Sequence, residues 1–147
     1  MGSAALKATF NRPDFALETK KLPPTKKINV TQIKIVVITG AAGRIAYALL
    51  PFLCNGEIFG SNVLVELRLL DLESNRDKLE GFKMELEDSA LDYLANIVIT
   101  TDPDTAFLNS DVVILLGGVP RSPGMERRDL ISKNINIMRA HVKPFIP

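Results

Sequence analysis

Two arginines lie six residues apart on a loop rich in glycine and proline, and they are well suited to bind an acidic substrate. The segment is GGVPRSPGMERRDL (117–130), and it carries Arg121 and Arg127 directly after an apolar stretch. A guanidinium stays charged at any working pH and binds a carboxylate through two parallel hydrogen bonds. The pair therefore predicts a small substrate with more than one acidic oxygen group, whereas a solvated basic loop is the alternative.

A second candidate site is the glycine-rich segment GAAGRIA (40–46), between a predicted strand and a predicted helix. Gly40 permits a tight turn, Gly43 lets the backbone approach a pyrophosphate, and Ala46 allows the helix to pack closely on the strand. The helix N-terminus adds unpaired N–H groups and the positive end of a dipole. The cofactor-binding residues predicted here are Gly40, Ala41, Ala42, Gly43, Arg44, Ile45 and Ala46.

Asp71 follows the second predicted strand and indicates which cofactor the turn binds. A carboxylate there accepts hydrogen bonds from both ribose hydroxyls of an adenosine and repels a 2′-phosphate, so we predict NAD rather than NADP. The spacing from Gly40 is 31 residues, and the loop 55–62 accounts for much of its excess over the usual ~20. An aspartate after a strand is also a common helix cap or turn former, but the glycine turn favours the cofactor interpretation.

Alternating strands and helices must position these residues. Apolar runs predict strands at 33–39, 63–70, 97–100 and 111–116, and helical periodicity predicts helices at 44–53, 74–94, 104–108 and 125–143. Such alternation is typical of right-handed βαβ units and a parallel sheet. We therefore predict an α/β fold, a Rossmann-type doubly wound parallel sheet that is partial, with about four strands, and no substrate domain. The domain spans residues 32–147, and residues 1–31 form a flexible basic N-terminal extension.

The helices carry further expectations. Pro51 lacks a backbone donor, so it should kink or shorten the first helix. The second helix should bury one apolar stripe, made of Leu79, Phe82, Leu86 and Ala90. The last helix should bury an inner face made of Leu130, Ile131, Ile135 and Met138, with His141 on its surface.

Composition narrows the class of protein. A chain of 147 residues with 46% hydrophobic and 24% charged residues has the size and balance of one globular domain. Its basic residues are not clustered with aromatic ones, so we expect no nucleic-acid partner. No apolar run reaches the roughly 18–20 residues of a membrane span, and we predict no membrane partner and no metal site. Cys54 is the only cysteine, which favours a reducing, cytoplasmic location.

The segments TGAAGRIAY, LLDLE, GFKMELED and GGVPRSPGMERRDL resemble malate dehydrogenases, especially the NAD-dependent cytoplasmic type within the lactate/malate dehydrogenase family. The resemblance covers residues 34–139. It implies that Arg121 binds the distal carboxylate of malate or oxaloacetate and that Arg127 polarises the keto oxygen. Lactate dehydrogenases have an uncharged side chain at the Arg121 position, so this arginine favours a dicarboxylate. The resemblance also implies cofactor contacts from Gly117, Gly118 and Asn134, and a substrate contact from Asn134.

The implied activity is that of an NAD-dependent oxidoreductase of malate metabolism and the tricarboxylic acid cycle. It transfers a hydride between malate and NAD to give oxaloacetate and NADH, and this chain resembles its cofactor-binding half. The family's catalytic histidine–aspartate pair is missing, so we expect a C-terminally truncated chain that is inactive by itself. His141 stands where relatives usually have glutamine. Family members also commonly dimerise through helices matching 44–53 and 74–94, which predicts a homodimer.

The same residues allow two alternative functions. A non-catalytic NAD-binding or subunit-interaction module stays open, although it leaves the two arginines without a substrate. A short-chain dehydrogenase shares the TGAAGRI turn but needs a Tyr-x-x-x-Lys pair. Tyr47 and Tyr93 are followed four residues later by Pro51 and Ile97, so that alternative is excluded.

Overall fold

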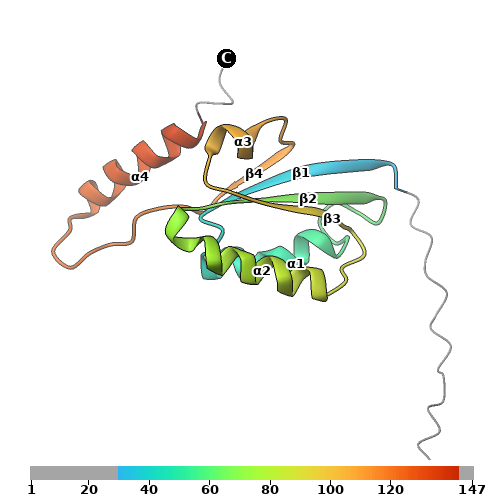
Figure 1. Cartoon of the computed structure of the whole chain (residues 1–147). Helices are drawn as coiled ribbons and strands as arrows, with labels where there is room; N and C mark the ends of the chain where they lie inside the picture. The colour runs from blue at the N-terminus through green and yellow to red at the C-terminus, as the bar shows by residue number, and fades with distance from the viewer. Residues whose placement is uncertain (1–29, 143–147) are drawn as a thin grey trace, which may run out of the picture.

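A four-stranded parallel sheet forms the centre of the computed structural model, which describes residues 30–142. The predicted extension, apart from residues 30 and 31, and the last residues, 143–147, lie outside this range. The strands are β1 (Gln32–Thr39), β2 (Val63–Leu70), β3 (Leu94–Thr100) and β4 (Val112–Leu115). Their order in the sheet is β3-β2-β1-β4, so the partial Rossmann-type α/β fold is confirmed (Figure 1).

The order of the strands places a crevice at a defined point of the sheet. The chain builds from β1 to β2 to β3 in one direction and then crosses over to place β4 on the other side of β1. β1 pairs with β2 along its whole length and with β4 over residues 36–39. Open α/β sheets bind ligands outside the carboxyl ends of their strands at such a reversal. The expected ligand site therefore lies where β1 and β4 end.

Helices cover both faces of the sheet. The helix α1 (Arg44–Cys54), the short η1 (Glu73–Asn75) and α2 (Arg76–Asp88) lie on one face, and α3 (Pro103–Phe107) lies on the other (Figure 1). The central strand is buried between the two layers, because Val36, Val37 and Ile38 are fully inaccessible to solvent. This burial on both faces explains the nearly continuous β-branched sequence of β1. No helix among residues 30–142 is both long enough and apolar enough to cross a membrane.

The helix predicted at 74–94 was too long, because α2 ends at Asp88. Ala90 adopts a left-handed conformation with φ +45°, and the backbone of Tyr93 then joins the sheet by accepting a bond of 2.8 Å from the N–H of Val65. β3 accordingly begins at Leu94 rather than at 97. Leu79 and Leu86 of the predicted stripe are buried and Phe82 packs against them, whereas Ala90 is exposed beyond the helix. Pairing with β2 overrides the local helical periodicity.

Pro51 does not shorten α1, which continues to Cys54. The helix loses the bond that a residue-51 N–H would have donated, yet it buries Ala46, Leu50, Leu53 and Cys54 against the sheet. Burial of an apolar side chain contributes roughly 1.5–3 kcal/mol, so several such side chains offset one missing hydrogen bond.

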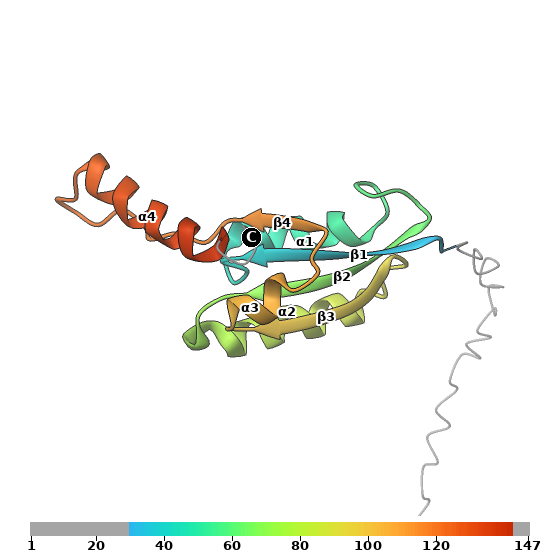
Figure 2. The ribbon, with the colours of Figure 1, turned by 90° about the horizontal axis from the view of Figure 1, so that it is seen from above.

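The predicted inner face of the last helix, α4 (Arg127–Val142), was wrong for three of its four residues, since only Leu130 is partly buried. Ile131, Ile135 and Met138 are between 41% and 50% exposed. Figure 2 shows that α4 extends away from the sheet, so little of the helix has a surface to pack against. Its contacts with the rest of the domain come instead from the face that carries Asn134, Ile137 and His141.

Candidate functional site

A cleft of about 630 Å³ lies at the carboxyl ends of β1, β2 and β4, where the strand order reverses. Its size falls within the range of small-molecule sites. The lining residues come from the glycine-rich turn, the end of β2, the segments after β3 and β4, and α4. They are Gly40, Ala42, Gly43, Leu70, Asp71, Leu72, Asn75, Thr101, Pro103, Leu116, Gly117, Gly118, Val119, Ile137, Ala140 and His141.

The glycine-rich turn is shaped by the close approach of β4. Gly40 has a φ of +65°, and a Cβ atom added to it would lie 2.6 Å from the Cα of Gly117. No side chain fits at that distance, so glycine is required here for both reasons. The N–H of Ala41 donates to the carbonyl of Leu70 at 3.3 Å, and the N–H of Gly43 donates to the carbonyl of Gly40 at 2.9 Å. The turn is therefore fastened to the neighbouring strand and to itself.

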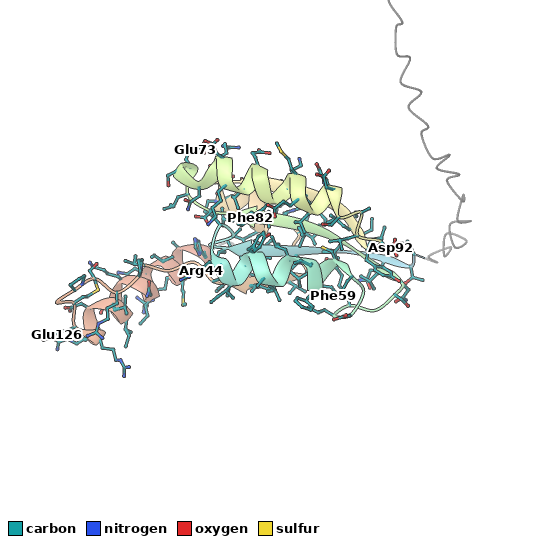
Figure 3. The ribbon with its side chains drawn as sticks, turned by 90° about the horizontal axis from the view of Figure 1, so that it is seen from below. Arg44, Phe59, Glu73, Phe82, Asp92 and Glu126 are labelled. Carbon is teal, nitrogen blue, oxygen red and sulfur yellow. The ribbon has the colours of Figure 1, made fainter. Side chains whose placement is uncertain are left out.

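The N-terminus of α1 follows the turn without a side-chain cap. Its N-cap residue, Gly43, has no side chain to offer, and the first turn carries no acidic residue. The first helical bond runs from the N–H of Tyr47 to the carbonyl of Gly43 at 3.0 Å. N–H groups left open in this way, at the positive end of a helix dipole, suit a phosphate group. Gly43 lines the cleft, whereas Arg44, which Figure 3 labels, and Ile45 are exposed and do not belong to its lining.

Ala41 and Ala46, the two remaining residues of the predicted cofactor segment, lie in the core below the turn. Both side chains are fully buried, and they pack in the core cluster with Val36 and Ile38 of β1. They support the turn, while its glycines and Ala42 face the cleft.

Asp71 lines the cleft directly after β2 and is half-buried. Its Oδ2 accepts from the N–H of Ala42 at 2.8 Å. Its Oδ1 accepts from the N–H of Leu72 and from Nδ2 of Asn75, both at 2.8 Å. A carboxylate offers about four acceptor positions, so one remains for a ribose hydroxyl. Binding both hydroxyls, as the sequence predicts, requires the cofactor to displace one of these three donors.

The structure does not bring Arg121 and Arg127 to the cleft. Both side chains are exposed and neither belongs to the lining. Nε of Arg121 donates to the carbonyl of Met125 at 3.1 Å, which closes a small local turn. Arg127 is the first residue of α4, at the end of the molecule far from the sheet, where Figure 3 labels the adjacent Glu126. Their predicted roles in substrate binding stay predictions.

Asn134 connects α4 to the segment that follows β4. Its Oδ1 accepts from the N–H of Val119 at 2.7 Å, and its Nδ2 donates to the Val119 carbonyl at 3.4 Å. A Cβ atom added to Gly118 would lie 3.2 Å from the same Oδ1. The amide of Asn134 therefore fixes the cleft wall formed by Gly117, Gly118 and Val119, and this is the role that the structure shows for it.

His141 is half-buried and lines the cleft, so its predicted place on the helix surface was wrong. Its ring centroid lies 6.0 Å from that of Phe107 on α3. Burial lowers the pKa of the imidazole, which favours the neutral form. Its Nδ1 is buried without a hydrogen-bond partner among the described residues. Ile137 and Ala140 of α4 line the cleft as well, so this side of the helix forms part of the cleft wall.

Sequence reasoning missed three polar or turn residues of the cleft. Asn75 lies one helical turn after Asp71, and Thr101 and Pro103 follow β3 directly. The signal was present, because the carboxyl ends of neighbouring parallel strands meet at one edge of the sheet. The order of β3 beside β2 was needed to place Thr101 and Pro103 there.

These features together fit a dinucleotide. The cleft lies at the reversal of strand order, an uncapped helix N-terminus opens onto it, and glycines at Gly40 and Gly117 leave no side chain between the two strand ends. The carboxylate of Asp71 lies at the end of the adjacent strand, where a ribose is bound in such folds.

Comparison with known proteins identifies the family. Residues 33–145 match the lactate/malate dehydrogenase, NAD binding domain. A malate dehydrogenase from Naegleria fowleri is 42% identical with a TM-score of 0.75, and the match covers 78% of this chain and 35% of that chain. An apo lactate dehydrogenase variant from Trichomonas vaginalis is 41% identical with a TM-score of 0.74, covering 78% of this chain and 34% of that one.

The lactate dehydrogenase of Trichomonas vaginalis in complex with NADH and oxamate is 41% identical with a TM-score of 0.68, and the match covers 76% of this chain and 33% of that one. The chain thus spans about a third of the length of these relatives. Malate and lactate enzymes match almost equally well, so the similarity favours neither substrate. The chain belongs to the lactate/malate dehydrogenase family, of which it carries the NAD-binding domain.

Proposed function

We propose that this chain is the NAD-binding half of a malate dehydrogenase. The observation that carries the proposal is the cleft at the strand reversal, with an uncapped α1 N-terminus on one side and the Asp71 carboxylate on the other. Bound NAD would supply the hydride acceptor for oxidation of the hydroxyl-bearing carbon of malate, and the hydroxyl proton would pass to a general base, so that the products are oxaloacetate, NADH and a proton. The α1 N-terminus would bind the pyrophosphate, and Asp71 would bind the adenosine ribose.

The choice of malate over lactate rests on Arg121. Its guanidinium is exposed and forms no ion pair with a carboxylate among residues 30–142, and the same is true of Arg127. A substrate with two carboxylates can use two such groups, one for the distal carboxylate and one for the keto acid end. Lactate has one carboxylate and would leave one of them without a partner.

We expect this chain to bind its cofactor without turnover. Oxidation of a hydroxyl needs a general base near the reacting proton, and acid–base catalysis contributes about 10²–10⁴-fold. His141 is the only histidine in the sequence, and its Nδ1 has no carboxylate partner among the described residues. It also lines the cleft from α4, whereas the exposed Arg121 does not belong to the lining.

A non-catalytic NAD-binding or subunit-interaction module is the second candidate function. The observation that favours it is that neither Arg121 nor Arg127 lines the cleft. Such a module would bind NAD as the first candidate does but would not respond to a dicarboxylate.

Calorimetric titration of the full chain separates these outcomes. NADH should bind saturably and more tightly than NADPH, and Asp71→Ser should weaken NADH binding at least about tenfold. Asp77→Ser is the matched control, because Asp77 is an exposed aspartate on the first turn of α2. Absence of NADH binding by the unmodified chain would overturn both functions.

The substrate is tested on the NADH-loaded chain. Oxaloacetate should raise the thermal midpoint, pyruvate should raise it less, and Arg121→Gln should remove the difference. An unchanged midpoint with both acids favours the non-catalytic module. A larger shift with pyruvate would contradict the assignment to malate and favour lactate.

We also propose a homodimer formed through α1 and α2. Large apolar side chains on these helices are exposed, including Ile45 at 71%, Phe52 at 51% and Met84 at 61%. The two helices lie side by side on one face of the sheet (Figure 3). Sedimentation at micromolar concentration should give a dimer that Met84→Glu weakens; a monomer for the unmodified chain would contradict it.

The cytoplasmic location stays a prediction.

A further inference from the structure

Lys78 reaches from α2 to the glycine-rich turn, although it does not line the cleft. Its Nζ donates to the carbonyl of Ala42 at 2.7 Å. The same Nζ lies 5.5 Å from the centroid of the Phe82 ring. That ring packs against Tyr47 of α1 at an interplanar angle of 44° with centroids 4.6 Å apart, and Figure 3 shows Phe82 between the two helices. The ammonium group therefore lies over the Phe82 ring while it donates to one backbone oxygen.

Ala42 is held from both sides. Its N–H donates to the Asp71 carboxylate at 2.8 Å, and its carbonyl accepts from Lys78 at 2.7 Å. The peptide that joins Ala42 to Gly43 is trans, so its carbonyl and its N–H point in opposite directions. Lys78 therefore turns the carbonyl away and leaves the Gly43 N–H to donate to Gly40 at 2.9 Å. The orientation of this peptide sets the entry into the first turn of α1.

We propose that Lys78 is a positioning residue for the pyrophosphate of the bound cofactor. It acts through the Ala42 peptide, by keeping a carbonyl dipole away from the phosphate-binding N–H groups. It also places a positive charge next to the segment that receives two phosphates. The inference rests on the proposed cofactor site, and nothing in the sequence pattern of the turn pointed to a lysine 36 residues away.

This role predicts an effect that depends on the phosphates of the ligand. Removal of the charge should weaken ligands that carry a pyrophosphate and spare ligands that carry only adenosine, because adenosine is bound at the Asp71 side. A merely structural role, in which loss of Lys78 loosens the whole cleft, would weaken both kinds of ligand together.

The test compares Lys78→Met, Lys78→Arg and Lys83→Met in the full chain. Methionine keeps an unbranched side chain over Phe82 but has no donor. Arginine keeps both the charge and the donors. Lys83 lies on the same helix and forms a partly exposed ion pair with Glu87 at 4.0 Å, so its variant is the matched control. NADH binding is followed by its fluorescence, and ADP and adenosine are added as competitors.

Lys78→Met should lower the affinity for NADH and ADP about tenfold and leave that for adenosine within about twofold. Lys78→Arg should retain most of the affinity for NADH and ADP that Lys78→Met loses. Lys83→Met should bind all three ligands like the unmodified chain. Equal losses for ADP and adenosine, or no loss for either, would overturn the proposal. If Lys78→Met does not fold, the ADP-to-adenosine ratio of Lys78→Gln decides the matter in the same way. If the unmodified chain does not bind NADH, the proposed cofactor site itself has failed.

Discussion

The glycine-rich turn, residues 40–43, and the arginine loop, residues 117–126, both follow the carboxyl ends of neighbouring strands, yet they are held very differently. In the turn, the N–H groups of Ala41, Ala42 and Gly43 and the carbonyl of Ala42 all have partners, supplied by β2, by Asp71, by Lys78 or by the turn itself. In the loop beyond Val119, the bonds are local, as in that between Arg121 and Met125.

This difference separates a prepared site from an unprepared one. The turn is fastened to the sheet before any cofactor arrives, so binding need not order it, and affinity is gained by avoiding that cost. Beyond Val119, the loop has no such hydrogen bond to β2 or to the helices packed on the sheet among residues 30–142. The parts that bind cofactor are therefore set by the fold of this domain, whereas Arg121 is held only by its local bond to Met125 and Arg127 is exposed.

The largest expected effect contrasts Gly40 with Gly124, both of which have positive φ values. Gly40→Ala places a Cβ atom 2.6 Å from the Gly117 backbone, whereas Gly124→Ala meets nothing within 4 Å. We expect Gly40→Ala to cost at least about 3 kcal/mol of unfolding free energy and to abolish NADH binding. Gly124→Ala should cost only about 1 kcal/mol. Urea denaturation measures both.

Gly81→Ala serves as the control for the alanine itself. Gly81 lies inside α2 with no atom within 4 Å of its added Cβ, so this substitution should stabilise the chain by about 1 kcal/mol. Equal losses from Gly40→Ala and Gly124→Ala would show that the turn is not more tightly constrained than the loop.

The next effect concerns Asn134, the link between the cleft wall and α4. Asn134→Leu removes the acceptor of the Val119 N–H, while Asn134→Asp keeps it. Because Val119 is partly exposed, water can replace the lost bond, and we expect a loss of about 1 kcal/mol for leucine and less for aspartate. NADH affinity should fall for leucine, since the wall from Gly117 to Val119 would lose its anchor. An unchanged affinity would show that the wall does not depend on α4.

The glycine-rich turn and the strands that flank it could be predicted from the sequence, whereas features that depend on tertiary contacts could not. The strands and the first helix were placed within a few residues, because buried β-branched runs and the turn glycines carry strong local signals. The end of α2 was misjudged, since the pairing of Tyr93 with Val65 is a tertiary contact that the helical periodicity does not record. The placement of Gly40 and Asp71 at one cleft followed from strand ends alone.

The side of α4 that faces the domain had no comparable signal. Ile131, Ile135 and Met138 have the spacing of a buried stripe, and only the direction in which the helix leaves the sheet exposes them. The same orientation brings His141 into the cleft. The contact of Lys78 with Ala42 was equally invisible, because it depends on how α2 lies against α1.

A smaller effect is expected from the pH dependence of stability at His141. Burial lowers its pKa in the folded chain, so between the folded and unfolded values the unfolded chain binds more protons. Stability from this group is fully present above the unfolded pKa of about 6.5 and is lost as the pH falls through the folded pKa. Between about pH 7.5 and about pH 5, the unmodified chain should lose more stability than His141→Gln. Parallel losses would show that the imidazole is solvated, and α4 would then not close the cleft.

The smallest effect is expected from Arg121 and Arg127. It tests whether the arginine loop, unlike the glycine-rich turn, is separate from the cofactor site. Arg121→Gln and Arg127→Gln should change the free energy of unfolding by less than about 0.5 kcal/mol, because both side chains are exposed and outside the cleft. NADH affinity should be unchanged in both variants when measured by the same titration as for Asp71→Ser. A substantial loss of NADH binding would mean that the loop reaches the bound cofactor after all. The loop would then belong to the cofactor site of this domain, and the distinction between a prepared turn and an unprepared loop would fail.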